Sequence, residues 1–235
     1  MTTWRDLPEW TDPIGADEQV LLVAATGGAK STLAATMTLP VRSLVVVDDK
    51  AAMTLPTSRT VELPAFGAAD PATYDRALRA ALRHREDVTN RVILRPHVLD
   101  VESFEAHDAI FHAVYERRAT ILWIDEITAT GATANRCQPW LRGISARGRT
   151  RGLGLWTCTQ APFGVTPPIL RRNASVMIFG PLDPDDVGDI RRPGIEIAET
   201  IPRKSGRFIV YRAGTRDPYR LYVPIPPQLR GWTAP

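Results

Sequence analysis

The stretch that decides the fold is Gln19-Val-Leu-Leu-Val-Ala-Ala-Thr-Gly-Gly-Ala-Lys-Ser-Thr32. An apolar strand runs directly into a glycine turn, and a lysine and two hydroxyl residues follow. This order suits a phosphate-binding loop, because the turn's N–H groups point into a concavity and the next helix directs its positive dipole end there. Lys30 would reach the outer phosphates and Ser31 would hold Mg²⁺. The predicted binding residues are Thr26, Gly27, Gly28, Ala29, Lys30, Ser31 and Thr32.

The loop departs from the usual pattern G-x-x-x-x-G-K-[ST], because both glycine positions are alanine, Ala24 and Ala29. Taken alone, the stretch is equally compatible with an ordinary strand, turn and helix. We expect Ala29 to adopt a left-handed backbone, which costs an alanine roughly 1 kcal/mol or more. Replacement of Ala29 by glycine should therefore keep or tighten ATP affinity.

Polar residues follow three further apolar strands. Ala119-Thr-Ile-Leu-Trp-Ile-Asp-Glu126 ends in two acids, of which Asp125 would hold the Mg²⁺ shell and Glu126 would orient and deprotonate the attacking water. Gln160 ends another strand and could place its amide at the γ-phosphate. The alternatives are a solvated acidic turn and a cap at Gln160. For Asp48-Asp49-Lys50, a simple charge cluster is an equally good interpretation.

Strands and helices alternate along the chain, which indicates an α/β fold with a mostly parallel central sheet and helices on both faces. Ligands of such sheets bind at the carboxyl ends of the strands, where all these polar residues fall. We predict an arm over residues 1–18, a core over 19–200, and a hairpin with a Pro-rich tail over 201–235. The predicted strands are 20–25, 43–48, 91–95, 120–125, 153–159, 175–179, 208–212 and 219–223; the predicted helices are 30–39, 71–85, 103–118 and 133–147.

Composition agrees with a packed globular chain. The 235 residues are 44% hydrophobic and 23% charged, with a net charge of +3 that only weakly suggests a polyanionic partner. No apolar run approaches the ~20 residues needed to span a bilayer, and the first residues lack the pattern of a secretory signal, so we expect a cytoplasmic location. Cys137 and Cys158 should be reduced thiols, and the four histidines show no metal-ligand spacing.

With these residues in hand, the chain resembles the FtsK–HerA superfamily of DNA-pumping ATPases from about residue 20 to 180. The segment Ala25-Thr-Gly-Gly-Ala-Lys-Ser31 is similar to that family's A-T-G-S-G-K-S loop, and Val45-Val-Val-Asp-Asp-Lys50 to its strand ending in D-P-K. Leu122-Trp-Ile-Asp-Glu126 matches the acidic motif. The most specific match is Arg149-Thr-Arg-Gly-Leu-Gly-Leu-Trp-Thr-Cys-Thr-Gln-Ala-Pro162, which resembles R-x-x-G, a strand and T-Q-x-P.

The resemblance implies a RecA-like P-loop core that works as a ring, usually a hexamer, with ATP between subunits. Arg149 stands where the family places an arginine that reaches the neighbour's γ-phosphate, with Arg147, Arg151 and Arg172 as alternates. Double-stranded DNA would pass through the pore and be held through its phosphates, independently of sequence. Residues 128–135 and 136–151 are the pore candidates, although a solvated basic helix explains the second segment equally well.

In its small size, the chain resembles the compact genome-packaging ATPases of tectivirus-type viruses. Such a motor would act in the host cytoplasm or on the virion, and would need a capsid vertex or portal protein as partner. A plasmid-transfer or DNA-end-processing motor is the alternative within the enzyme class. A non-hydrolysing nucleotide-binding assembly protein is the alternative outside it, although the intact Lys30, Ser31, Asp125, Glu126 and Gln160 argue against a decayed site.

Overall fold

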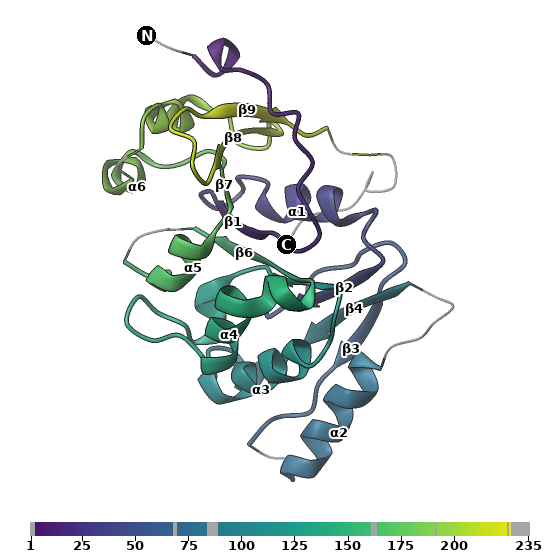
Figure 1. Ribbon diagram of the computed structural model, residues 1–235. Coiled ribbons are helices and arrows are strands. Elements are labelled where there is room, and N and C mark those ends of the chain that lie inside the picture. The colour runs from purple at the N-terminus through teal and green to yellow at the C-terminus, as the bar shows by residue number, and fades with distance from the viewer. Residues whose placement is uncertain are drawn as a thin grey trace.

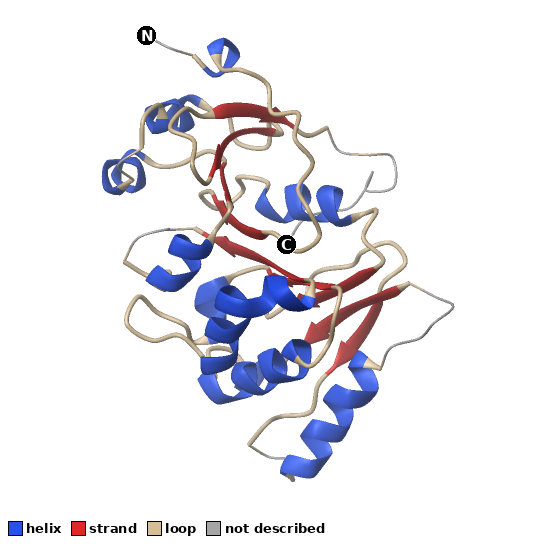
Figure 2. Cartoon of the chain, in the orientation of Figure 1, coloured by secondary structure: helices blue, strands red, loops and turns tan. Residues whose placement is uncertain are grey.

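A computed structural model describes residues 3–67, 70–83, 89–160, 164–190, 192–224 and 226. Its centre is a nine-stranded sheet in the order β3-β4-β2-β5-β6-β1-β7-β8-β9, with helices on both faces (Figures 1 and 2). The strands are β1 Gln19–Val23, β2 Ser43–Val47, β3 Arg59–Glu62, β4 Asn90–Arg95, β5 Thr120–Ile124, β6 Leu153–Thr159, β7 Val176–Phe179, β8 Arg207–Arg212 and β9 Tyr219–Tyr222. This is the predicted α/β architecture.

The strands from β3 to β7 pair in parallel, so their carboxyl ends lie at one edge of the sheet. The register keeps these ends level: Val23 pairs with Thr159, and Val47 pairs with Ile124. The residues that follow β1, β2, β5 and β6 therefore emerge side by side. These are the segments in which the sequence placed its polar candidates.

The apolar strands divide their side chains between two layers, because successive residues point to opposite faces. Helix α1 (Lys30–Thr38) packs on one face against residues such as Leu22 and Val46. The other face carries Val45, Val47, Leu122 and Ile124, which pack with the helices on that side. Those helices are α2 (Pro71–Leu82), α3 (Phe104–Tyr115), α4 (Pro139–Arg147) and α5 (Pro168–Asn173). Both faces are thus covered, which explains the continuous apolar runs in the central strands.

The last third of the chain extends the sheet. Strands β8 and β9 add to β7 by antiparallel pairing and form the predicted C-terminal hairpin. Helix α6 (Pro184–Asp189) and a 3₁₀ segment (Ile195–Thr200) cover β1, β7 and β8 through a third apolar cluster. The N-terminal arm packs on the hairpin: the Trp4 indole donates to the Phe208 carbonyl at 2.9 Å, and Trp10 N donates to the Arg220 carbonyl at 2.8 Å.

The structure corrects one predicted helix. The helix expected over 133–147 begins at Pro139, because a proline at the first turn keeps the preceding Gln138 extended, with ψ 139°. Residues 133–136 form a turn instead, in which Thr133 N donates to the Arg136 carbonyl at 2.8 Å. The sequence also missed β3, α5 and α6, which are only four to six residues long. The end of the helix predicted over 71–85, and most of the Pro-rich tail, lie outside the described residues.

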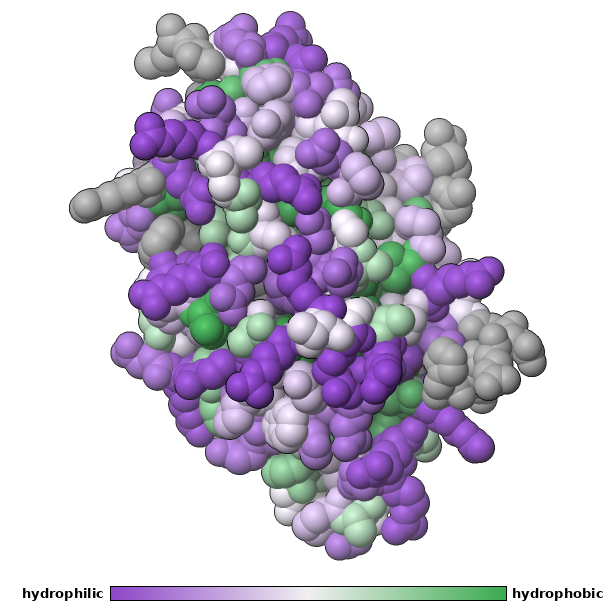
Figure 3. Space-filling view, in the orientation of Figure 1, coloured by the Kyte–Doolittle hydropathy of each residue, from purple (hydrophilic) through white to green (hydrophobic). Residues whose placement is uncertain are grey.

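Two smaller expectations concern membrane-spanning segments and the thiols. Within the described part of the chain, no helix is long and apolar enough to cross a membrane. Cys137 and Cys158 are free thiols, as predicted, and burial raises the pKa of Cys137 to about 11. Figure 3 shows a mainly hydrophilic face on which apolar side chains form small, separate areas.

Candidate nucleotide-binding site

The loop between β1 and α1 is compact and is held by backbone contacts. Ala24 N donates to the Thr159 carbonyl at 3.3 Å, and Ala25 N to the Pro181 carbonyl at 2.9 Å, so both neighbouring strands fix its start. Gly27 has a φ of 74°. Gly28 has no room for a side chain, because a Cβ there would lie 2.6 Å from the Ala24 Cβ and 2.8 Å from the Ala25 carbonyl oxygen. Glycine is therefore required at 28 for steric reasons.

The two alanine departures have different structural consequences. Ala29 caps α1 with φ 65° and ψ 23°, the left-handed conformation that the sequence predicted. Ala24 is fully buried, and its methyl group faces two glycines: a Cβ at Gly180 would also come within 2.8 Å of it. The chain thus accommodates Ala24 by having glycine at 28 and 180, whereas Ala29 retains an unfavourable backbone conformation.

The hydroxyl and the acid predicted to bind Mg²⁺ are in direct contact. Ser31 lies in the first turn of α1, and Asp125 directly follows β5. The Ser31 Oγ donates a hydrogen bond to Asp125 Oδ1 at 2.6 Å. Asp125 is 4% exposed, and burial raises its pKa, while the Ser31 hydrogen bond and the Lys50 charge oppose that shift. Its Oδ2 is buried without a hydrogen-bond partner and lies 3.8 Å from the Lys50 ammonium. An orphaned carboxylate oxygen beside a hydroxyl is a suitable ligand pair for a hard divalent cation.

The fit to Mg²⁺ depends on phosphate ligands as well. Across the described residues there is no group of three or more acidic, histidine or cysteine side chains that could hold a metal ion. Magnesium in nucleotide sites takes one or two protein oxygens, with phosphates and water completing its shell. Ser31 and Asp125 fit that arrangement, and the metal would enter together with the nucleotide.

Lys30 points back into the loop. Its ammonium donates to the carbonyls of Ala24 and, at 3.4 Å, of Ala25. Burial lowers the pKa of Lys30, and the nearby carboxylates of Glu126 and Asp125 partly offset this effect. The cation is thus placed among carbonyl groups at the centre of the loop, where phosphate oxygens could replace those carbonyls as its partners.

Glu126 and Gln160 form one hydrogen-bonded chain with the loop. Thr26 Oγ1 donates to Gln160 Oε1 at 2.9 Å, and Gln160 Nε2 donates to Glu126 Oε2 at 3.4 Å. The other carboxylate oxygen of Glu126 accepts from Thr128 Oγ1 at 3.1 Å. Glu126 is 8% exposed, so these donors stabilise a carboxylate that is largely removed from water. The three strand ends are therefore connected to each other.

The cluster after β2 serves mainly to fix its own turn. The Asp48 carboxylate accepts from Met53 N at 2.8 Å and from Arg95 Nε at 3.2 Å. Asp49 Oδ1 lies 2.8 Å from Nε2 of His107, a fully buried residue of α3. Of the three residues, only Lys50 reaches the site, through its ion pair with Asp125. The sequence did not single out His107; the available signal was a polar side chain on the apolar face of a predicted helix.

No protein-family model matches the sequence, and no curated protein matches it. Solved structures do match. The genome packaging NTPase B204 from Sulfolobus turreted icosahedral virus 2, in complex with sulfate, is 17% identical, with a TM-score of 0.68 over 91% of this chain and 99% of that one. The same NTPase with ATP-gammaS gives 0.67 and 17% identity over 91% and 100%. The bacterial conjugative coupling protein TrwBdeltaN70 gives 0.59 and 11% over 95% and 91%.

The chain has the fold of these P-loop NTPases. The match extends over nearly the whole length of each chain. At these identities the similarity concerns the fold alone, and the chemistry of the site depends on this chain's own residues.

The arginine candidates lie apart from the candidate nucleotide-binding site. Arg149 is exposed in the 3₁₀ segment Gly148–Arg151, which precedes β6 and therefore lies at the amino edge of the parallel strands. Arg147 and Arg172 are also exposed, and the Arg151 guanidinium stacks 4.7 Å from the Tyr115 ring centroid. Thr32, the last of the predicted nucleotide-binding residues, is not an arginine candidate; it lies half-buried in the first turn of α1. Within one chain, the site thus contains lysines, acids and an amide but none of these arginines.

Proposed function

We propose that this chain is an ATP-hydrolysing motor that translocates double-stranded DNA. The observation that carries the proposal is the contact of Ser31 with Asp125 at 2.6 Å, beside Lys30 and Glu126, at the carboxyl edge of the sheet. A structural α/β scaffold has no need of two buried acids and a partly buried lysine at one place. A phosphate-binding loop, an acid for Mg²⁺ and an acid for water are the groups that hydrolysis requires.

The residues would divide the chemistry as follows. Mg²⁺ bound with ATP supplies electrophilic activation of the γ-phosphate. The loop N–H groups and the Lys30 ammonium bind and orient the phosphates, and Ser31 and Asp125 hold the metal. Glu126 accepts a proton from the attacking water at a carboxylate oxygen, and the Gln160 amide orients that water. Because Gln160 also contacts Thr26 and Glu126, a change at the γ-phosphate would reach both the loop and the catalytic acid.

The position of Arg149 supports a ring. An arginine of one subunit could complete the site of the next, because a heterologous contact brings unlike edges of two copies together and closes into a ring when the rotation permits. Arg149, exposed at the opposite edge, fits this role in a hexamer. Mixing Arg149→Ala subunits with Glu126→Gln subunits should restore activity in part, because some interfaces then combine an intact Glu126 with an intact Arg149. A ring made only of Arg149→Ala subunits that keeps full activity would exclude this residue.

The biological role that we favour is genome packaging, with a capsid vertex or portal protein as partner, in the host cytoplasm or on the virion. The support is the match to packaging NTPases, with TM-scores from 0.60 to 0.68, compared with 0.59 to a conjugative coupling protein. Plasmid transfer is the second candidate, because the coupling protein matches 95% of this chain.

The test is ATP hydrolysis with and without double-stranded DNA at two salt concentrations. DNA-stimulated, salt-sensitive turnover is expected, because phosphate contacts release counterions. Lys30→Ala and Glu126→Gln should abolish turnover, whereas the exposed controls Lys204→Ala and Glu199→Gln should not. ATP binding without turnover under all conditions would favour the non-hydrolysing assembly protein. Absence of ATP binding would refute the site.

A further inference from the structure

One turn of the chain holds a group of exposed aliphatic side chains. Val98 and Leu99, in the 3₁₀ segment Val98–Asp100 that follows β4, are 76% and 75% exposed, and the neighbouring Val101 is also exposed. Across the described residues, the one other large apolar side chain with such exposure is Tyr222 on β9. Aliphatic side chains grouped at the surface are a feature of interaction sites. Residues 98–101 are called the apolar turn below.

Hydrogen bonds from inside the molecule hold the apolar turn in its outward position. Leu99 N donates to His97 Nδ1 at 3.2 Å, and the buried Asp100 carboxylate accepts from Phe66 N at 2.8 Å. Ser103 N donates to the Asp100 carbonyl at 2.8 Å. The turn is therefore fixed on both sides, so the fold itself presents the aliphatic side chains to solvent.

The apolar turn is also joined to the segment that carries the proposed catalytic acid. Glu102 N donates to the Ala129 carbonyl at 2.7 Å, in the 3₁₀ segment Ile127–Thr130 that begins directly after Glu126. Gly131 packs so closely here that a Cβ would lie 2.4 Å from the Glu102 carbonyl oxygen. The apolar turn thus lies at the carboxyl edge of the sheet, beside the nucleotide site. In the ring that we propose, this edge faces the neighbouring subunit.

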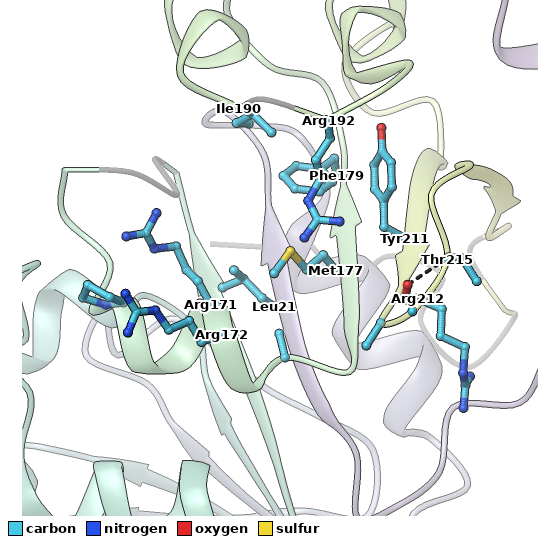
Figure 4. A pocket seen from close by; sticks show the side chains of 14 residues that line it. Leu21, Arg171, Arg172, Met177, Phe179, Ile190, Arg192, Tyr211, Arg212 and Thr215 are labelled. Carbon is cyan, nitrogen blue, oxygen red and sulfur yellow. Dashed lines mark hydrogen bonds between the residues drawn. The ribbon is translucent and has the colours of Figure 1, made fainter.

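A cavity of about 560 Å³ lies elsewhere, on the sheet face that carries α2–α5. Its volume is within the range of about 300–1,000 Å³ that is typical of ligand pockets. Strands β1 and β7 supply an apolar floor through Leu21, Met177 and Phe179 (Figure 4). A second cavity, of about 410 Å³, has the ion pair of Glu9 and Arg220 in its lining. The first cavity is therefore the better match for aliphatic side chains.

The apolar turn and the first cavity lie at opposite edges of the parallel strands. Ala174 and residues 213–215 belong to the rim of the cavity, and the antiparallel pair of Val176 with Arg212 places them beside the start of β7. The cavity therefore reaches the amino edge, where Arg149 is also exposed. A convex apolar surface at one edge and a concave one at the other cannot meet within one chain. They can meet between copies, in a heterologous contact that repeats around a ring.

The charges at the two surfaces are opposite in sign. Glu102 is exposed at the end of the apolar turn. Arg172 and Arg192 extend at the rim of the cavity, and there is no acidic side chain among the described residues that line it (Figure 4). The carboxylate that accompanies the apolar turn would therefore meet cations rather than like charge, which favours this pairing over a wrong one.

We propose that the apolar turn of one copy of this chain docks in the cavity of a second copy. Leu99 would pack on the floor at Met177, and the Glu102 carboxylate would lie near the arginines of the rim. A second copy is the occupant because the turn stands beside the nucleotide site, and because the edges on which the two surfaces lie are the ones that the Arg149 contact also joins. The inference rests on the ring of the proposed function and names surfaces that hold the ring together.

Cross-linking between two batches of protein tests the contact directly. One batch carries Leu99→Cys and the other carries Ala213→Cys at the exposed rim, each with Cys137→Ser; Cys158 is fully buried and can stay. A short bis-maleimide should join the mixed batches into a covalent dimer but should not join either batch to itself. A variant with both cysteines should give a ladder of larger species. Ala72→Cys, equally exposed but at the start of α2, is the matched control for Ala213→Cys and should not react with Leu99→Cys.

Sedimentation velocity over a range of protein concentrations, with ATP and duplex DNA present, is the second measurement. Leu99→Glu should weaken self-association at least about tenfold, as expected for a central contact residue. Tyr222→Glu, which removes the exposed apolar side chain on β9, is the control and should assemble like the wild type. Thermal unfolding should show that both variants fold, since both positions are exposed.

The outcomes separate this contact from the ring itself. If the wild type assembles but Leu99→Cys is not joined to Ala213→Cys, or if Leu99→Glu assembles equally well, the contact is refuted and the ring stands. Cross-linking of Leu99→Cys to itself would show an isologous contact and would also overturn the proposal. A wild type that stays monomeric under all these conditions would refute the ring and the contact together, and the apolar turn would then serve a different partner.

Discussion

Ala29 offers the sharpest test of the phosphate loop, because its backbone conformation can be changed without touching a catalytic group. With φ at 65°, it occupies the left-handed region directly before Lys30. This conformation costs an L-residue about 1–2 kcal/mol, whereas glycine adopts it freely. Ala29→Gly removes that cost and leaves every N–H of the loop in place.

Two losses oppose this gain. Glycine makes the unfolded chain more flexible, at about 0.5–1 kcal/mol. The half-buried Ala29 methyl group packs against the α1-side apolar cluster, and losing it gives up part of the ~0.8 kcal/mol of a buried methyl or methylene group. The sum lies within about 1 kcal/mol of zero, so the melting temperature should change by less than about 4 °C in a chain of this length.

ATP affinity should stay the same or tighten by up to about fivefold, the equivalent of 1 kcal/mol. Ala29→Val is the comparison, because a β-branched residue is a genuine outlier at positive φ and should weaken both stability and binding. Thermal unfolding and titration with a fluorescent ATP analogue measure the two effects. A tenfold or greater loss of affinity in Ala29→Gly would refute the loop geometry described here.

Three further substitutions test other contacts. Gly28→Ala should weaken ATP binding more than tenfold, because its Cβ would lie 2.6 Å from the Ala24 Cβ. Gly27→Ala is the comparison: a Cβ at Gly27 has nothing within 4 Å, so this variant should lose only about 1–2 kcal/mol of stability. Equal ATP affinity of the two variants in titrations would contradict this prediction. His107→Leu should destabilise the fold by about 3–5 kcal/mol in urea unfolding, because it leaves the buried Asp49 carboxylate without its partner. His107→Gln should retain part of that stability. A loss below about 1 kcal/mol in His107→Leu would show that the pair contributes little. Asp125→Asn should abolish Mg²⁺-dependent ATP hydrolysis without destabilising the metal-free fold. Burial raises the pKa of Asp125, so the folded state binds the carboxyl proton more tightly than the unfolded state does. The wild type should therefore lose stability relative to Asp125→Asn as the pH rises above about 4. A wild type that gains stability relative to the variant over that range, in unfolding measured at several pH values, would contradict this direction.

The strands and the central site were predictable because their signals are local. Continuous apolar runs such as Val45–Val47 predict buried parallel strands, and parallel strands bring Ser31, Asp125 and Gln160 to one edge without knowledge of the strand order. The left-handed Ala29 followed from its position before the lysine. Each inference needed only a short stretch of sequence and the period of a strand.

The elements that the sequence missed depend on neighbours that are distant in the chain. Strand β3 contains Arg59 and Glu62 and is mostly exposed, so it has no apolar pattern and exists because it pairs with β4. His107 contacts Asp49, 58 positions away, and nothing near either residue indicates the pair.

The charges of the site explain why one chain should not suffice. Lys30 and Lys50 are its cations, and Asp125 and Glu126 are its anions, so the protein groups nearly cancel. A triphosphate adds several negative charges, of which Mg²⁺ balances two. Charge that develops on the γ-phosphate in the transition state would therefore call for a further cation, and stabilising that charge is usually the largest contribution to catalysis in such sites. The exposed Arg149, at the other edge of the sheet, lies too far to supply the cation within its own chain, and in the ring that we propose it would do so for a neighbour. Hydrolysis in this fold would then depend on assembly, and rates should rise with protein concentration more steeply than in proportion.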